Sequence, residues 1–279
     1  MSLRDKAELL RSLHVPGRPL VLANVWDAGS AVVAARAGAP ALATTSAGLA
    51  WSLGAADGDR IDRDTALAAV ARIAAVVDVP LSADVESGFG ADAAGVADTV
   101  RGVLDAGAVG INLEDSTWDR SPGAAPLRPV AEAAERVAAA RAAADERGVP
   151  LYLNARTDVY LQLREEPAAM LEQALERAAA YVAAGASGVF VPGVTDLETV
   201  AALTKGIDAP VNILAGPGAP TVAELASTGV ARVSLGSDVA VAAYTLMDRA
   251  TRELLAAGTY GAVEGGLSYR ELNSAFVRS

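Results

Sequence analysis

The chain of 279 residues contains no cysteine and only one histidine, His14. The lack of cysteine excludes disulfide bonds, thiolate metal sites and a cysteine nucleophile. His14 lies in the N-terminal segment before the first apolar run, so a zinc site built on histidines is excluded and imidazole catalysis is not expected. Carboxylates, Arg, Lys, Tyr, hydroxyl groups and amides remain for any chemistry.

Long apolar runs, aromatic residues and clustered positive charge are also scarce. Charged residues interrupt every long apolar stretch before the roughly 18 residues that a membrane helix needs, and the N-terminus lacks a signal-peptide pattern. The net charge of −11 argues against nucleic acid and anionic membranes as partners, because both bind clustered Lys and Arg. We therefore expect a cytoplasmic protein whose core, with only 4% aromatic residues, is aliphatic.

Short apolar runs alternate with Ala-rich helical stretches along most of the chain. Several helical stretches end in a glycine, which can turn the chain back into the next strand. This alternation predicts a parallel sheet covered by helices. The eight apolar runs predicted as strands are 19–25, 41–46, 80–85, 110–114, 151–156, 188–192, 210–215 and 231–236.

Eight such units in about 240 residues favour a (β/α)8 TIM-type barrel over an open doubly wound sheet. An open sheet normally carries a Gly-rich phosphate loop after its first strand, and here that position reads N-V-W-D-A-G-S. We predict one barrel domain over residues 1–279. Residues 238–279 hold more helix than the barrel needs, so they are predicted to be a C-terminal oligomerisation segment.

Acidic residues gather at the predicted carboxyl ends of adjacent strands, where barrel enzymes hold their catalytic groups. Asp84 and Glu86 follow the third strand two positions apart, so both side chains point to one face. Glu114 ends the fourth strand and Arg156 ends the fifth. Carboxylates held so close need a cation or a shared proton. We therefore predict a Mg²⁺ or Mn²⁺ site facing an arginine that binds a substrate carboxylate with two prongs.

Two structural explanations compete with this interpretation. Asp84 and Glu86 could end an ordinary strand and point into solvent, although Glu114 on the neighbouring strand disfavours that explanation. Other acids near strand ends could simply cap helix N-termini, where Asp and Glu are favoured. The acids for which capping is at least an equal alternative are Asp27, Asp62, Asp64 and Asp115.

Five motifs resemble those of the isocitrate lyase/phosphoenolpyruvate mutase superfamily. They are T-T-S-A-G (44–48), S-A-D-V-E-S-G-F-G (82–90), G-I-N-L-E-D (110–115), N-A-R-T-D (154–158) and P-V-N-I-L (210–214). The resemblance spans most of the chain. It implies a barrel whose eighth helix is exchanged between paired subunits, in a homodimer or homotetramer. It also implies Mg²⁺ bound together with a small carboxylate substrate that forms an enolate.

The resemblance also implies roles for individual residues. Asp84 would bind the metal directly, while Asp59, Glu86 and Glu114 would hold it through water. The implied substrate-binding residues are Trp26, Ser46, Ala47, Gly48, Arg156 and Asn212. Arg156 and Glu114 are the implied catalytic residues, and the acid/base group stays open among Ser116, Asp119, Arg120 and Tyr160. Tyr160 is the candidate that we take as the acid/base, and packing at a strand end is its alternative role.

The loop after the fourth strand departs from the best-known members of the superfamily. Isocitrate and methylisocitrate lyases carry a Lys-Lys-Cys-Gly-His loop there, whereas this chain reads S-T-W-D-R-S-P-G-A-A-P-L-R. The phosphonopyruvate enzymes carry a loop with Lys and Asn there and a His after strand 6, where this chain has Pro192 and Gly193. What remains is the mutase-like branch, which includes oxaloacetate decarboxylases and lyases for substituted malates.

The expected function is therefore Mg²⁺-dependent. We expect a lyase or decarboxylase that breaks a carbon–carbon bond in a small 2-oxo or 2-hydroxy di- or tricarboxylate through a stabilised enolate. Two alternatives stay open. One is carbon–phosphorus bond chemistry on phosphonopyruvate, and the other is a barrel that binds metal and oxo acid without catalysis.

Overall fold

The strands form one parallel sheet in a computed structural model that describes residues 1–119 and 121–277. The sheet order is β1-β9-β8-β7-β6-β5-β4-β3-β2, so each strand from β2 to β8 pairs with the next one along the chain. This is the order of a TIM-type barrel. The predicted fold class is confirmed, and every strand lies within one of the predicted apolar runs.

The barrel closes where the first predicted strand divides into two short parts. β1 (Leu20–Leu22) pairs with β9 (Arg232–Ser234), and β2 (Asn24–Val25) pairs with β3 (Leu42–Thr44). Because β1 and β2 are separated only by Ala23, the two ends of the sheet meet at one point of the chain. The remaining strands are β4 (Leu81–Asp84), β5 (Gly110–Glu114), β6 (Tyr152–Arg156), β7 (Gly188–Val191) and β8 (Val211–Leu214).

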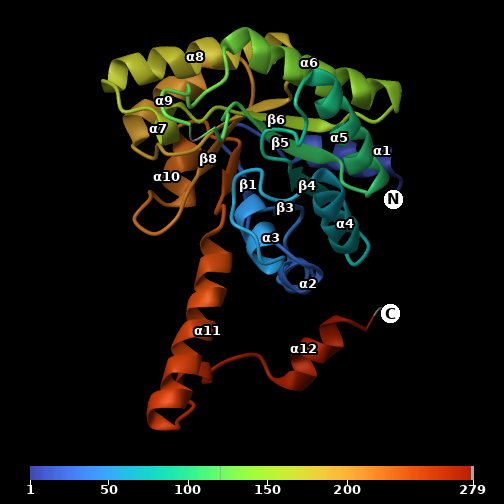
Figure 1. Cartoon of the computed structure of the whole chain (residues 1–279), viewed down its shortest axis with the longest axis vertical. Coiled ribbons are helices and arrows are strands. Elements are labelled where there is room, and N and C mark those ends of the chain that lie inside the picture. The colour runs from blue at the N-terminus through green and yellow to red at the C-terminus, as the bar shows by residue number, and fades with distance from the viewer. Residues whose placement is uncertain (120, 278–279) are drawn as a thin grey trace.

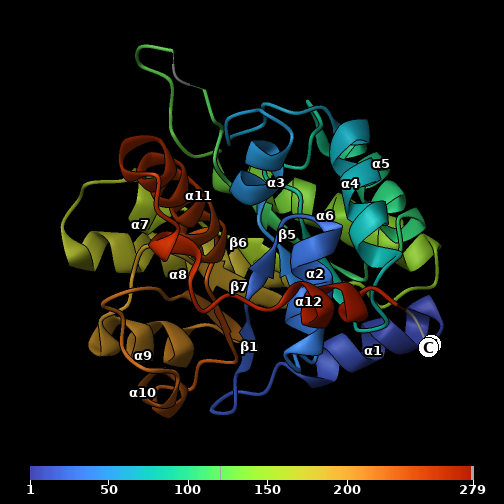
Figure 2. The same ribbon diagram turned by 90° about the horizontal axis from the view of Figure 1, so that it is seen from below.

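Helices surround the barrel (Figures 1 and 2). Those that follow strands are α2 (Ala28–Arg36), α3 (Ser46–Ser52), α4 (Arg63–Ala74), α5 (Ala93–Asp105), α6 (Val130–Glu146), α7 (Val159–Gln162), α8 (Pro167–Ala183), α9 (Leu197–Gly206) and α10 (Val222–Ser227). The side chains of Asp27 and Asp62 cap α2 and α4, and Asp64 lies in the first turn of α4. Helix N-termini therefore explain these three acids, Asp27 and Asp62 as caps and Asp64 through the helix dipole.

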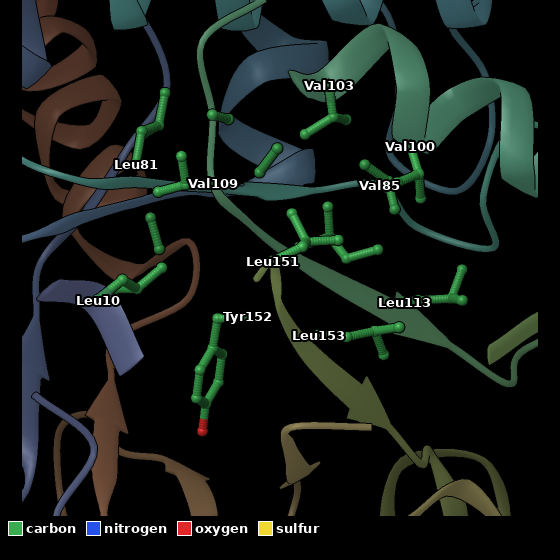
Figure 3. Close-up of a cluster of buried hydrophobic side chains, with 14 of the residues drawn as sticks. Leu10, Leu81, Val85, Val100, Val103, Val109, Leu113, Leu151, Tyr152 and Leu153 are labelled. Atoms are coloured by element: carbon green, nitrogen blue, oxygen red, sulfur yellow. The ribbon is translucent and has the colours of Figure 1, made fainter. Parts of the chain in front are cut away.

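Aliphatic side chains fill the space between the strands and the helices, as the low aromatic content predicts. Figure 3 shows Leu81, Val109, Leu151 and Leu153 of this core beside Val100 and Val103 of α5. Helix α1 (Leu3–Ser12) lies beside this core with its Leu10 fully buried. A Cβ atom on Gly110 would come within 2.7 Å of Leu10, so only glycine lets α1 pack this closely against the start of β5.

The C-terminal segment leaves the barrel. Helix α11 (Asp238–Ala257) projects away from the sheet and the chain then returns through η1 (Gly261–Val263) to α12 (Tyr269–Ala275), which lies near α2 (Figure 1). Ala240 is the one buried residue of α11. Among the described residues, no helix is both long and apolar enough to cross a membrane.

Candidate active site

A cavity of about 150 Å³ lies at the carboxyl ends of the strands. Its polar lining residues are Asn24, Thr45, Ser46, Asp57, Asp84, Asn112, Arg156, Ser234 and Ser237. The side built by α7, β7 and β8 supplies apolar groups, namely Leu161, Phe190, Pro192 and Leu214. Because β7 and β8 lie across the barrel from β3 and β4 in the sheet order, these apolar groups face Thr45, Ser46 and Asp84. Arg156, Ser234 and Ser237 lie at or just after the ends of β6 and β9, which are the neighbours of β7 and β8.

Asp84 is the acid that reaches the cavity from the end of β4. Its backbone N–H donates to the hydroxyl of Thr44 (2.7 Å), which fixes the end of β4 against β3. Its carboxylate accepts from the backbone N–H groups of Ser46 (3.3 Å) and Glu86 (3.4 Å). Burial raises the pKa of Asp84, while the positive charge of Arg156 opposes that rise.

Glu86 and Asp59 form a second group of acids beside Asp84. The backbone N–H of Asp59 donates to the Glu86 carboxylate, and the hydroxyl of Ser87 donates to the Asp59 carboxylate. Both acids adopt a left-handed backbone, with φ near 50°, so two tight turns bring their side chains together. Glu86 is 1% exposed, and burial is the main reason that its pKa is raised to about 8.

Asp57 is an acid of the site that the sequence did not single out. It lines the cavity, contributes negative charge beside Asp84, and its buried Oδ1 has no hydrogen-bond partner among the described residues. Asp59, which was predicted instead, turns toward Ser87 and does not line the cavity. The sequence held three acids close together, Asp57, Asp59 and Asp62, with no pattern to show which one points inward.

Arg156 is held by two buried carboxylates. Its Nε and Nη2 donate to Asp158 (2.6 and 3.0 Å), and its Nη1 lies 2.8 Å from Glu114. The edge formed by Nε and Nη2 is therefore occupied by Asp158, which leaves one N–H on each terminal nitrogen for a ligand. The guanidinium also lies over the ring of Phe190, 5.7 Å from its centroid. Burial raises the pKa of Glu114 despite this ion pair.

Asp115 supports this arrangement from below rather than capping a helix. Its carboxylate accepts from Arg177 (3.1 Å), from the hydroxyl of Tyr181 (2.8 Å) and from the backbone N–H of Asp158 (2.9 Å). It is 1% exposed. Asp115 thus fixes the backbone of Asp158, which in turn orients Arg156.

The predicted substrate-binding residues divide into two groups. Ser46 and Ala47 line the cavity, as expected. Gly48 lies behind them, where a Cβ atom would come within 2.9 Å of Trp26, and Trp26 lines a separate hollow beside α2. Asn212 does not reach the cavity because its amide is used inside the barrel, between Asn154 (3.1 Å) and Ser234 (3.2 Å).

The structure does not bring the predicted acid/base candidate to the cavity. Tyr160 packs against the buried side chains of the β7–β8 side, and the neighbouring Leu161 lines the cavity instead. This agrees with the alternative packing role. Ser116 donates to Asp158 (2.5 Å) beneath the site, and Asp119 is exposed. Arg120 lies outside the described residues.

The loop after β5 is joined to the site by Trp118. The indole N–H of Trp118 donates to Glu114, and its ring lies against Gly58, where a Cβ atom would come within 2.7 Å of the ring. The base of the loop is closed by a bridge between Ser116 and Leu127. Beyond this base the described parts of the loop, 117–119 and 121–126, extend away from the barrel (Figure 2).

The residues at the site suit a hard divalent cation. No three acids of the described residues converge closely enough to chelate one ion on their own. The available donors are carboxylate oxygens, and the buried Oδ1 atoms of Asp57 and Asp59 have no partner within the described chain. Such oxygen donors, with water filling the remaining positions, are what Mg²⁺ prefers. A divalent charge would also offset the burial that raises the pKa values of Asp84, Glu86 and Glu114.

His14 takes no part in this site. It stacks on Tyr152, with the ring centroids 3.6 Å apart, and its Nδ1 lies 2.8 Å from the carbonyl oxygen of Leu10. Tyr152 begins β6, whereas Arg156 ends it. His14 therefore lies at the opposite end of the barrel from the acids.

Comparison with known proteins shows to which family the chain belongs. The family model of phosphoenolpyruvate phosphomutase matches residues 10–255. The chain belongs to the isocitrate lyase/phosphoenolpyruvate mutase superfamily. The predictions of superfamily membership and of an enzyme are thereby confirmed.

Individual relatives show how broad this superfamily is. The 2-methylisocitrate lyase of Escherichia coli is 33% identical over 76% of this chain and 70% of its own length. A solved Burkholderia cenocepacia structure with a provisional lyase/mutase assignment is 40% identical, with a TM-score of 0.90 and coverage of 99% of this chain and 97% of that one. Oxaloacetate acetylhydrolase in complex with oxalate is 25% identical, with a TM-score of 0.84 and coverage of 97% and 93%.

Proposed function

We propose that the protein is a Mg²⁺-dependent lyase that breaks a carbon–carbon bond of a small 2-oxo dicarboxylate, with decarboxylation as the reaction best suited to the cavity. The observation that carries this proposal is the lining of the cavity. It combines Arg156 with Asp57 and Asp84, but no Lys, His, Cys or Tyr lines it among the described residues. Loss of the C4 carboxylate of a 2-oxo dicarboxylate as CO2 needs no proton transfer before the carbon–carbon bond breaks, because the electron pair is delocalised as an enolate, so it suits such a site.

The cation, when bound, would supply Lewis-acid stabilisation of the negative charge that develops on the substrate oxygens. Asp84 would hold it directly, with Glu86, Glu114 and one or both of Asp57 and Asp59 acting through water. The free N–H groups of Arg156 bind and orient a carboxylate of the substrate. Asp158 and Glu114 keep the guanidinium in place, so its orientation is set before the substrate enters.

The reaction on oxaloacetate balances without a further reactant. The bond between C3 and C4 breaks, its electron pair forms the enolate of pyruvate, and the C4 carboxylate leaves as CO2. A proton from water then adds to C3 and gives pyruvate.

Pyruvate release from oxaloacetate, measured above the spontaneous rate with and without EDTA, tests the proposal. We expect turnover that EDTA removes and added Mg²⁺ restores. Metal-independent turnover, or no turnover of any 2-oxo or 2-hydroxy dicarboxylate offered, would count against it.

Asp57 favours one second candidate, cleavage of a 2-hydroxy dicarboxylate. That reaction starts with loss of the hydroxyl proton, and the unpartnered Oδ1 of Asp57 is a base that faces the cavity. Release of a 2-oxo acid from malate derivatives would identify it. Consumption of phosphonopyruvate, followed by ³¹P NMR, would indicate carbon–phosphorus chemistry instead. Tight binding of Mg²⁺ and oxalate in calorimetry without any turnover would indicate a binding protein.

A further inference from the structure

The apolar wall of the cavity contains four side chains from one sector of the barrel. Leu161 comes from α7, Phe190 from β7, Pro192 from the turn after β7, and Leu214 from the end of β8. Phe190 is 5% exposed and its ring lies beneath Arg156. Leu214 lies against Gly236, where a Cβ atom would come within 2.8 Å of it. Neighbouring residues therefore hold the wall in place.

The cavity offers enough positive charge to bind two carboxylates of a substrate. Arg156 is the one cation among its described lining residues, and a divalent ion at Asp84 would be the other positive centre. A third carboxylate would lie against Leu161 and Leu214 without a positive partner, which is unfavourable for a buried charge. A hydrocarbon group in the same place would gain from leaving water, by about fourfold in affinity for each methylene.

We propose that Leu161, Phe190, Pro192 and Leu214 form an apolar subsite for an alkyl substituent on C3 of the substrate. The preferred substrates are then 3-alkyl-substituted 2-oxo dicarboxylates, and 2-oxo tricarboxylates are rejected. This inference rests on the proposed function, because it assigns the C3 substituent of the same substrate to one wall of the same cavity.

Two pairs of compounds test the subsite in steady-state decarboxylation assays corrected for the spontaneous rate. The first pair is oxaloacetate and 3-methyloxaloacetate, for which we expect the methyl compound to have about fourfold higher kcat/KM. The second pair is 3-ethyloxaloacetate and oxalosuccinate, which carry an apolar and a charged substituent at C3. We expect oxalosuccinate to have kcat/KM at least about tenfold below that of 3-ethyloxaloacetate.

Leu161 is the position at which the subsite can be changed with a matched control. Leu161 and Leu197 are both 36% exposed, but Leu197 lies on α9 and does not line the cavity. Leu161→Asn is expected to lower the ratio of kcat/KM for 3-ethyloxaloacetate to that for oxaloacetate, and Leu161→Arg to raise kcat/KM for oxalosuccinate. Leu197→Asn is expected to leave all these ratios unchanged.

The outcomes of these experiments distinguish failure of the proposed subsite from failure of the proposed function. Metal-dependent decarboxylation of oxaloacetate with equal or lower kcat/KM for the alkyl compounds would overturn the subsite and leave the proposed function standing. A preference for alkyl groups that Leu161→Asn leaves intact would also overturn it. No metal-dependent turnover of any of the four compounds would overturn the proposed function, and the subsite with it.

Discussion

Asp84 and Glu86 are close neighbours whose carboxylates are used differently. Asp84 lines the cavity, whereas Glu86 is buried beside it and accepts the backbone N–H of Asp59. Asp84→Asn is therefore expected to lower metal-dependent kcat/KM by about a thousandfold or more, because the direct metal ligand loses its charge. Glu86→Gln keeps an acceptor for Asp59 and should cost about 10- to 100-fold. Activity and Mn²⁺ affinity of both variants check this, and equal losses would contradict it.

Asp57 and Asp59 offer a similar contrast within one loop. Asp57 faces the cavity, and Asp59 is bound by Ser87 outside it. Asp57→Asn is expected to lower metal-dependent kcat about 100-fold with little change in thermal stability, because a carboxylate that faces the cavity and would hold the cation through water loses its charge. Asp59→Asn should lower kcat less and stability more. Steady-state kinetics and melting temperatures of both variants test this prediction. A larger loss of kcat in Asp59→Asn than in Asp57→Asn would show that Asp59, and not Asp57, acts in the cavity.

His14 makes stability depend on pH at the far end of the barrel. Burial lowers its pKa from 6.5 to about 3. Below pH 6.5 the unfolded chain therefore binds a proton that the folded protein does not, so the free energy of unfolding falls as pH falls. The slope contributed by His14 is at most about 1.4 kcal/mol per pH unit.

Replacing His14 with a ring that cannot be protonated isolates this effect. Phenylalanine can still stack on Tyr152, so His14→Phe is expected to flatten the pH dependence of stability between pH 6.5 and 5. Denaturant unfolding of both proteins at several pH values measures it. Parallel pH profiles for the wild type and the variant would show that His14 becomes protonated without unfolding.

At the scale of elements, the strands were predictable and several short helices were not. Each strand is a compact apolar run, so its pattern survives in the sequence. Helix α3 begins directly after β3 and has seven residues, too few for a helical period to stand out. Its start is set by the hydroxyl of Thr45, which accepts the N–H of Gly48 (3.5 Å). Such contacts depend on neighbouring backbone positions that a one-dimensional pattern does not contain.

The hydrogen-bond partners of the site residues could not be predicted from the sequence for the same reason. The sequence placed Arg156 and Glu114 at adjacent strand ends, and the parallel register then makes them direct neighbours. It did not show that Asp158 would occupy one edge of the guanidinium or that Asn212 would be used inside the barrel. Both outcomes depend on side-chain directions within two or three residues of a strand end, where the regular alternation stops.

The loop after β5 and the loop that carries Asp57 meet through Trp118 and Gly58. Gly58 has φ of 91°, a backbone that L side chains rarely adopt, and its missing side chain makes room for the indole ring. Gly58→Ala is expected to lower both stability and kcat/KM, by strain and by displacing Trp118. Trp118→Phe replaces the indole with a smaller ring and removes the N–H to Glu114 and part of the contact with Gly58, so it should lower kcat/KM several-fold. Equal melting temperatures for Gly58→Ala and the wild type would contradict the packing argument.

At the scale of the whole molecule, the C-terminal segment exposes apolar side chains that no other part of the described chain covers. Met247, Leu254 and Leu255 on α11 are 67%, 52% and 81% exposed, and Tyr260, Leu267 and Tyr269 beyond it are also exposed. On the barrel, Val21 of β1 and Val33 of α2 are exposed as well. Apolar surface on an extended helix, together with bare apolar positions on the barrel, is typical of association between copies.

We propose that residues 238–279 join two or four copies of the chain, with α11 of one copy packed against its partner. Light scattering after gel filtration should then give the mass of a dimer or tetramer. The double variant Leu254→Glu, Leu255→Glu places two charges on the exposed face of α11 and is expected to shift the protein toward monomer and lower its melting temperature. The matched control is Leu9→Glu on α1, which is also an exposed leucine, at 36%, but lies outside the C-terminal segment. A monomeric wild type, or a double variant that keeps the wild-type mass, would remove this role from α11, because an interface that buries these leucines cannot accept two charges without loss of affinity.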